Sequence, residues 1–239
     1  MKNLFKKLQW FIVCVALFSF VGCDQNKTTI SGTFDNCDKR YFVLLQMLPD
    51  DLVPIDTVLL LNGTFSYKIK NEQIGVYFMQ FSDTTMLPFI ADMGEKLVFS
   101  GDWNNLSKNY TAIGSEETKL LLENRRKLDT LYLKTEDLSR QFVLYTGYGN
   151  YDSVAVKRLD SIYDSNFAAH KQYLTESILS HPDKLASLFA FYQTLGTNSF
   201  FSMKEDAEIL RKIYSALSEK YPNSIYVKDL HEKLESLNE

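Results

Sequence analysis

The sequence predicts an α+β fold in which an N-terminal antiparallel β-sandwich is followed by a C-terminal all-α helical domain. From Thr28 to about Gly114, short runs of β-branched and aromatic residues are separated by turn residues at the 8- to 12-residue spacing typical of a sandwich. After Ser115 the apolar residues recur at the helical period. We therefore expect a β-sandwich domain over residues 28–114 and a helical domain over residues 115–239.

The composition agrees with this division. The chain has 239 residues, of which 45% are hydrophobic and 14% aromatic, with only 10 glycines and 5 prolines. These values indicate packed elements rather than long loops. The 26 basic residues are outnumbered by 30 acidic ones. This balance lacks the basic patch of a nucleic-acid-binding protein, so we expect no nucleic-acid partner.

The first residues are typical of an export signal. Residues 1–22 combine three lysines with an apolar run from Trp10 to Val21, which is short for a bilayer span of about 20 residues. The ending Phe20-Val21-Gly22-Cys23 resembles the lipobox of bacterial lipoproteins, although Phe20 stands where leucine is usual. The resemblance implies a signal peptide over 1–22, lipid attachment at Cys23, a lipidated tether over 23–27 and anchoring to the outer membrane, on its periplasmic or surface face. The alternative is an ordinary signal peptide in which Cys23 is incidental.

The β half contains eight predicted strands. Asn62-Gly63 is the clearest hairpin turn, and the alternation of residues 64–70 indicates a strand with one buried face. Residues 41–45 do not alternate, which favours a central strand covered on both sides. The predicted strands are 28–34, 39–48, 53–60, 64–70, 75–82, 86–91, 96–101 and 108–113.

The second half contains five predicted helices. The first begins after Gly114-Ser115 with Glu116 and Glu117 in its first turn, where the helix dipole favours negative charge. The stretch 147–150 separates it from a second helix. The third begins at Pro182-Asp183 and ends at Gly196, the fourth begins with the capping box Ser202-x-x-Glu205, and the last follows Tyr221-Pro222-Asn223-Ser224.

The apolar periodicity also predicts which residues form the two cores. We expect Val43, Leu45, Phe65 and Phe99 in the core of the sandwich. Leu128, Leu138, Phe142 and Leu159 lie on the apolar stripes of the first two helices, so we expect them in the helical core.

The cysteines do not support a redox site. Cys14 leaves with the signal peptide and Cys23 is consumed by the lipid, so Cys37 is the single thiol of the mature chain. A thioredoxin-type centre needs a Cys-x-x-Cys motif, in which one thiol attacks and the other resolves. We therefore interpret Cys37 as an inert loop thiol and expect no intramolecular disulfide.

Motifs for catalysis, metals and cofactors are also missing from the sequence. The three histidines, His170, His181 and His231, are far apart and none has a partner at metal-ligand spacing. The sequence contains no nucleophile elbow, Walker loop or dinucleotide fingerprint. We therefore expect no catalytic residues, no metal site and no cofactor, and interpret the chain as a non-enzyme.

Several short motifs resemble a known family. The β half is similar to the domain of unknown function that precedes a thioredoxin-like disulfide interchange domain in certain Gram-negative envelope lipoproteins, and the helical half is similar to the linker of the same proteins. The family's thioredoxin domain carries a Cys-x-x-Cys, which the 239 residues do not contain, so the resemblance does not imply redox activity for this chain. The motifs are Ile30-Ser31-Gly32, Ile55-Asp56-Thr57-Val58, Asn62 to Tyr67, Glu95-Lys96-Leu97, Gly101-Asp102, Gly114-Ser115, His181-Pro182-Asp183 and Leu217 with Tyr221 to Ser224.

These observations lead to one expected function and two alternatives. We expect a lipid-anchored cell-envelope protein that acts as a non-enzymatic binding or scaffolding module. One alternative is the accessory region of a membrane-anchored thiol:disulfide oxidoreductase whose thioredoxin domain is missing or supplied in trans. The other is a carbohydrate- or peptide-binding lipoprotein that uses the aromatic residues of 145–151 and Phe200-Phe201. The expected partners are the membrane, through the lipid on Cys23, and an envelope protein, peptide or glycan.

Overall fold

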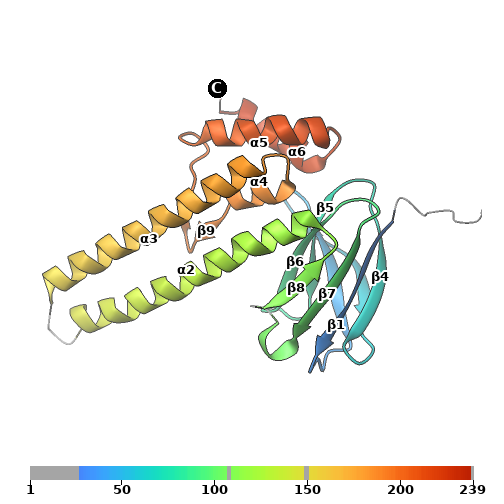
Figure 1. Cartoon of the computed structure of the whole chain (residues 1–239), viewed down its shortest axis with the longest axis horizontal. Coiled ribbons are helices and arrows are strands. Elements are labelled where there is room, and N and C mark those ends of the chain that lie inside the picture. The colour runs from blue at the N-terminus through green and yellow to red at the C-terminus, as the bar shows by residue number, and fades with distance from the viewer. Residues whose placement is uncertain (1–26, 107–108, 148–150, 238–239) are drawn as a thin grey trace, which may run out of the picture.

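The computed structural model describes residues 27–106, 109–147 and 151–237. The signal peptide and the predicted lipid attachment site, Cys23, lie outside the described residues. Within those ranges no helix is long and apolar enough to cross a membrane. The fold is α+β. Two four-stranded sheets pack as a sandwich at one end of the long axis, a helical hairpin projects toward the other end, and the C-terminal helices lie above the region where the two meet (Figure 1).

The eight predicted strands are confirmed, with ends that differ by at most two residues. One sheet has the order β4-β1-β7-β8 and the other β3-β2-β5-β6. Neighbouring strands are antiparallel, except that β1 and β7 run parallel. The strands are β1 Lys27–Asp35, β2 Tyr41–Met47, β3 Leu52–Leu59, β4 Thr64–Lys70, β5 Gly75–Gln80, β6 Met86–Ala91, β7 Lys96–Asp102 and β8 Tyr110–Ile113.

The strand β2 has the central position that its sequence predicts. It lies between β3 and β5, and Phe42, Leu44 and Leu45 are buried. The edge strand β3 contains Pro54, which an edge position tolerates because no neighbour requires its missing N–H. A register shift opposite Leu44 and Leu45 interrupts the pairing of β2 with β3 near this proline.

A glycine turn joins the sandwich to the first long helix. Gly114 has φ +98°, and a Cβ there would lie 1.9 Å from the backbone oxygen of Lys96. The following Ser115 is the N-cap, and its hydroxyl donates to the oxygen of Ile90 in β6 at 3.1 Å. Thr118, one turn further, accepts from the nitrogen of Ile90 at 3.0 Å. The helix is therefore bonded to the sheet at the point where it begins.

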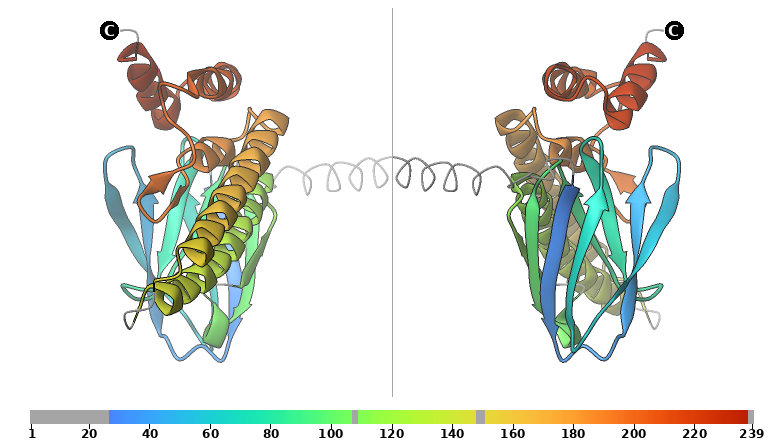
Figure 2. Two further views of the ribbon diagram at one scale, coloured as in Figure 1. Left: turned by 90° about the vertical axis from the view of Figure 1, so that its left-hand side faces the viewer. Right: turned by 90° about the vertical axis from the view of Figure 1, so that its right-hand side faces the viewer.

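The helices form a long hairpin and a compact C-terminal group. The first two helices lie side by side and project away from the sandwich (Figures 1 and 2). At 1.5 Å per residue they are about 46 and 42 Å long. The helical elements are η1 Trp103–Asn105, α2 Glu116–Thr146, α3 Ser153–Ser180, α4 Leu185–Phe191, α5 Ala207–Lys220 and α6 Ile225–Glu235, with the two-residue strands β9 Thr194–Leu195 and β10 Asn198–Ser199 between α4 and α5.

Two predicted helix boundaries are wrong. The third helix ends at Phe191 rather than Gly196, because Gly196, at φ +62°, forms the turn between β9 and β10. The fourth helix begins at Ala207 rather than after Ser202. The capping bond from the nitrogen of Glu205 to the Ser202 hydroxyl is present at 3.3 Å, but it stabilises a turn that precedes the helix.

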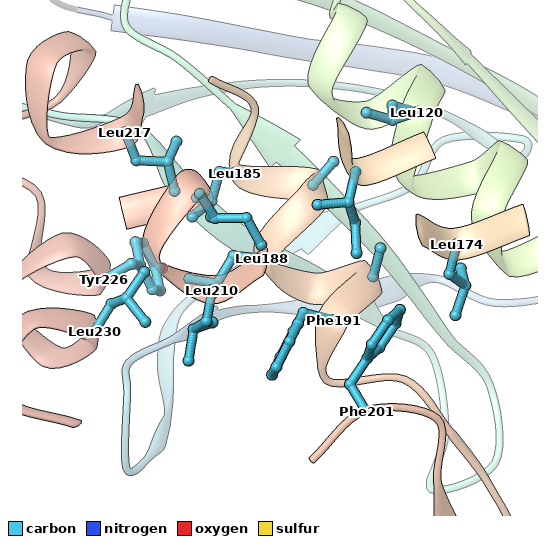
Figure 3. Packing of buried hydrophobic residues seen from close by; sticks show 14 of the residues in the cluster. Leu120, Leu174, Leu185, Leu188, Phe191, Phe201, Leu210, Leu217, Tyr226 and Leu230 are labelled. Atoms are coloured by element: carbon cyan, nitrogen blue, oxygen red, sulfur yellow. The ribbon is translucent and has the colours of Figure 1, made fainter. Parts of the chain in front are cut away.

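The buried apolar residues form two clusters. We call them the sandwich cluster, which fills the space between the two sheets, and the helical cluster, which contains α4 at its centre (Figure 3). Six of the seven residues of α4 are buried. The helical cluster also includes three residues from the β half: Ile74, which precedes β5, Val76 in β5 and Ile90 in β6.

The core predictions are confirmed only in part in both halves. Phe65 and Phe99 belong to the sandwich cluster, whereas Val43 is half-buried and Leu45 is buried outside that cluster, which takes Phe42 and Leu44 from β2 instead. In the helical half, Leu159 is buried and Leu128 is half-buried. Leu138 is only half-buried and Phe142 is 43% exposed, so the prediction that both lie in the helical core is wrong. The reason is that the hairpin extends beyond α4 and the sandwich, where the two helices cover only the line between them (Figure 1).

Candidate functional site

The residues that the sequence singles out are not brought together into one site. Cys37 is a half-buried free thiol beside the sandwich cluster. Phe200 and Phe201 are buried, and their rings stack on Phe167 and Phe191 at centroid distances of 4.5 and 5.0 Å. These two rings are therefore part of the core and are not available for a ligand.

The histidines have structural surroundings. His170 lies against the ring of Phe200 at 4.6 Å, and its Nε2 is 3.4 Å from the amide oxygen of Gln193. Burial lowers the pKa of His170, because the charged imidazolium loses hydration. His181 bonds to a backbone oxygen of its own helix, and His231 stacks on Tyr214. Among the described residues no group of three or more His, Cys, Asp or Glu side chains could hold a metal ion.

A cleft of 660 Å³ lies between the sandwich and the middle of α2. We call it the α2 cleft. One wall is formed by Asn105 in η1 and Asn109 just before β8, and the other by one face of α2. Positions 126, 129, 130 and 133 share that face because they are three and four residues apart. The lining residues are Asn105, Asn109, Arg126, Asp129, Thr130, Tyr132, Leu133 and Glu136.

The wall formed by the sandwich is held by short-range bonds. Asp102 is the N-cap of η1, and its carboxylate accepts from the nitrogen of Asn104 at 2.9 Å. The nitrogen of Asn109 donates to the oxygen of Asn105 at 2.9 Å. These bonds fix the backbone that carries both lining asparagines.

The wall formed by α2 is anchored at two points. Arg126 donates from Nη2 to the backbone oxygen of Tyr110 at 3.0 Å, which ties the helix to β8. The hydroxyl of Tyr132 accepts from the nitrogen of Gly196 at 3.0 Å and donates to the oxygen of Thr194 at 3.5 Å. The ring of Tyr132 is therefore held in place between α2 and the β9–β10 turn.

The groups of the α2 cleft are suited to hydrogen bonding and stacking. It offers two carboxamides, two carboxylates, one guanidinium, an aromatic ring and the apolar side chain of Leu133. The hydroxyl of Thr130 donates to the backbone oxygen of Arg126 at 2.9 Å, so its proton is engaged in a hydrogen bond within the helix. The lining therefore supplies planar donors and acceptors rather than an activated nucleophile.

Sequence reasoning did not find the α2 cleft. Its signal in the sequence is a polar face on the first long helix, with Arg126, Asp129 and Glu136, and two asparagines before β8. A polar helix face is normally solvated. Only the angle at which α2 leaves the sandwich places this face opposite Asn105 and Asn109.

Comparison with known proteins gives one match. A family model described as Domain of unknown function (DUF4369) matches residues 28–121. This confirms a domain of unknown function over the β half. The match continues past Gly114 into the first turns of α2, where Thr118 and Leu120 are buried. Searches of curated proteins and of solved structures gave no match.

Proposed function

We propose that this chain is a lipid-anchored, non-enzymatic binding module of the bacterial cell envelope that holds its ligand in the α2 cleft. The observation that carries the proposal is the cleft itself. Its volume of 660 Å³ lies within the range of about 300 to 1,000 Å³ that small-ligand sites occupy. Its polar groups are mounted on a long helix and on a hydrogen-bonded connection, which favours a preorganised site.

The proposed anchor is the lipid on Cys23, which the sequence resemblance supports. Cys23 precedes the first residue of β1, Lys27, by four positions. Four extended residues span at most about 14 Å, so an anchored chain keeps the start of β1 close to the membrane. Several acyl chains, each contributing about 0.8 kcal/mol per buried methylene, are sufficient for stable attachment.

The chemistry of the cleft favours a carbohydrate over the other expected ligands. Carboxamides, carboxylates and a guanidinium can each bond to two neighbouring hydroxyl groups, and the fixed ring of Tyr132 offers an apolar face. Asp129 and Glu136 disfavour an anionic ligand by charge repulsion. The proposed ligand class is therefore an uncharged or cationic, hydroxyl-rich saccharide.

Calorimetric titration of neutral and amino-sugar oligosaccharides tests the cleft. The protein is the chain from Asp24 onward, which contains every described element. Tyr132→Ala and Asp129→Ala should each weaken binding by about tenfold or more. Tyr41→Ala, which removes an exposed ring from the sandwich, should leave it unchanged. If no saccharide binds, or if the cleft variants bind as well as the unsubstituted chain, the proposed ligand site is wrong.

The anchor is tested separately in cells. Cys23→Ala should abolish labelling by radioactive palmitate and release the protein into the soluble envelope fraction. A variant that remains labelled and membrane-bound would contradict the lipoprotein assignment and would leave the result for the cleft unaffected.

A further inference from the structure

The far end of the α2–α3 hairpin is apolar and exposed. We call it the hairpin tip and define it by six residues whose exposed fractions run from 39% for Tyr145 to 77% for Val154. The connecting residues 148–150 lie outside the described part of the chain. The members of the hairpin tip are Phe142, Val143, Leu144 and Tyr145 at the end of α2 and Tyr151 and Val154 at the start of α3.

The geometry of the tip differs from that of a surface made for one partner helix. Successive helical residues point about 100° apart, so the four consecutive apolar residues 142–145 cover every direction around α2. A helix that docks on one partner carries its apolar residues on one face. A helix end that is apolar on all sides is suited to apolar surroundings that enclose it on all sides.

Positive charge lies directly behind the tip. Within residues 139–158 there are three cations, Arg140, Lys157 and Arg158, and one carboxylate, Asp152, although the whole chain has more acidic than basic residues. Asp152 is the N-cap of α3, and its Oδ1 accepts from the nitrogens of Val154 and Ala155, both at 3.0 Å. Its charge is therefore directed at the start of the helix.

The next carboxylates lie further from the tip. At 1.5 Å per residue, Arg140 is about 3 Å behind Phe142, whereas Asp137 and Glu136 are about 7.5 and 9 Å behind it. Both carboxylates pair with Arg140, at 3.5 and 3.2 Å.

The order is the same on α3. Lys157 and Arg158 are about 4.5 and 6 Å behind Val154, and Asp160 is about 9 Å behind it. Apart from the capping Asp152, both helices therefore present apolar residues first, cations next and carboxylates last as they lead away from the tip.

We propose that the hairpin tip inserts into the surface of an anionic lipid bilayer. An interfacial helix buries its apolar part about 5 to 10 Å deep, at the boundary of headgroups and acyl chains. At that depth Arg140, Lys157 and Arg158 lie among the headgroup phosphates, where each basic residue is attracted to the anionic surface. Tyr145 and Tyr151 take the interfacial position that tyrosines favour. This activity is independent of the α2 cleft and of the lipid on Cys23.

Vesicle binding by the unlipidated chain from Asp24 onward tests the proposal. The protein should sediment with vesicles that contain about one third phosphatidylglycerol and remain in solution with pure phosphatidylcholine. Leu144→Trp places a fluorescent reporter at the tip, and its emission should shift to the blue with the anionic vesicles only. Circular dichroism checks that each variant keeps the fold, since all substituted positions are exposed.

Two double variants distinguish binding through the hairpin tip from nonspecific adsorption to vesicles. Val143→Ser with Leu144→Ser, and Lys157→Glu with Arg158→Glu, should each reduce vesicle binding by about tenfold or more. The controls should bind as the unsubstituted chain does, because they make the same changes away from the tip. They are Leu59→Ser with Leu61→Ser, at residues 75% and 79% exposed at the end of β3 and just beyond it, and Lys68→Glu with Lys204→Glu.

Three results would overturn the proposal. The first is the absence of binding to anionic vesicles, or binding that the tip variants do not change. The second is equal binding to both kinds of vesicle. The third is self-association in sedimentation velocity that Leu144→Ser abolishes, which would make a second copy of the chain the occupant of the tip.

Discussion

At the scale of single residues, a buried carboxylate connects the first long helix to α4. Glu117, in the first turn of α2, is 3% exposed and accepts through Oε2 from the nitrogen of Ala186 in α4 at 3.0 Å. Its Oε1 is buried without a hydrogen-bond partner among the described residues. Burial raises the pKa of Glu117, because the ionised form loses hydration.

The raised pKa of Glu117 predicts a pH dependence of stability. A carboxyl group whose pKa is higher in the folded than in the unfolded state stabilises the fold below its ordinary value of 4.5, and this contribution is lost as the pH rises through the folded value. Glu117→Gln has no carboxyl group to ionise at this position. The free energy of unfolding of Glu117→Gln minus that of the unsubstituted chain should therefore be larger at about pH 8 than at about pH 5. Urea denaturation at both pH values measures this. Glu219→Gln, at an exposed position, is the control, and equal behaviour of the two variants would contradict the prediction.

Two leucines of the hairpin should differ in their contribution to stability. Leu159 is 6% exposed, and Leu159→Ala should lower the free energy of unfolding by about 2 to 5 kcal/mol. Both leucines line the open groove of 310 Å³ between α2 and α3, but Leu138→Ala should cost less, because Leu138 is half-buried and already contacts water. Chemical denaturation of the two variants checks the order. Equal losses would show that the distal hairpin has a closed core.

At the scale of elements, the local signals explain why the strands were predictable. Turn residues such as Asn62-Gly63 delimit each strand, and alternation assigns its buried face. The apolar stripe of α2 predicted the helix but not the exposure of Phe142, because periodicity identifies a face and not the element that covers it. The α2 cleft was not predictable for a related reason, since it depends on the angle between a helix and a sheet that are each regular on their own.

Two glycines with positive φ should respond differently to alanine. At Gly114 the new Cβ would clash with the backbone oxygen of Lys96, so Gly114→Ala should destabilise the protein by more than about 3 kcal/mol. At Gly196 an added Cβ would meet no atom beyond its chain neighbours within 4 Å, so only the conformational cost of about 1 to 2 kcal/mol applies. Thermal unfolding compares the two variants. A larger loss at Gly196 would be inconsistent with this account of the junction.

At the scale of the whole molecule, the helices and the sandwich share buried contacts. Ile74, Val76 and Ile90 of the sheet side belong to the helical cluster. The hydroxyl of Tyr226 in α6 also accepts from the nitrogen of Val76 at 3.0 Å and donates to the oxygen of Met47. The division of the chain between residues 114 and 115 into two domains stays a prediction. These contacts predict how the two domains should unfold.

We expect the two predicted domains to unfold together in the full chain. Unfolding of the helices alone would expose the apolar side chains of Ile74, Val76 and Ile90 to water. The folded helices therefore stabilise the sandwich by covering these side chains. Near- and far-ultraviolet circular dichroism should therefore give coincident transitions. The separate fragments 28–114 and 115–239 should keep β and α spectra respectively and melt at lower temperatures than the whole chain. Two resolved transitions in the full chain would show that the halves are energetically independent.

The position of β1 determines how the protein bears mechanical load. It is a central strand, paired over seven residues with β4 on one side and over seven with β7 on the other. If the chain is tethered at Cys23, a pull from the membrane enters at the first residue of β1 and acts along the strand. The force is then shared by two ladders of hydrogen bonds loaded in shear, whereas an edge strand has only one. A tether at Cys23 would therefore load a central strand rather than an edge strand.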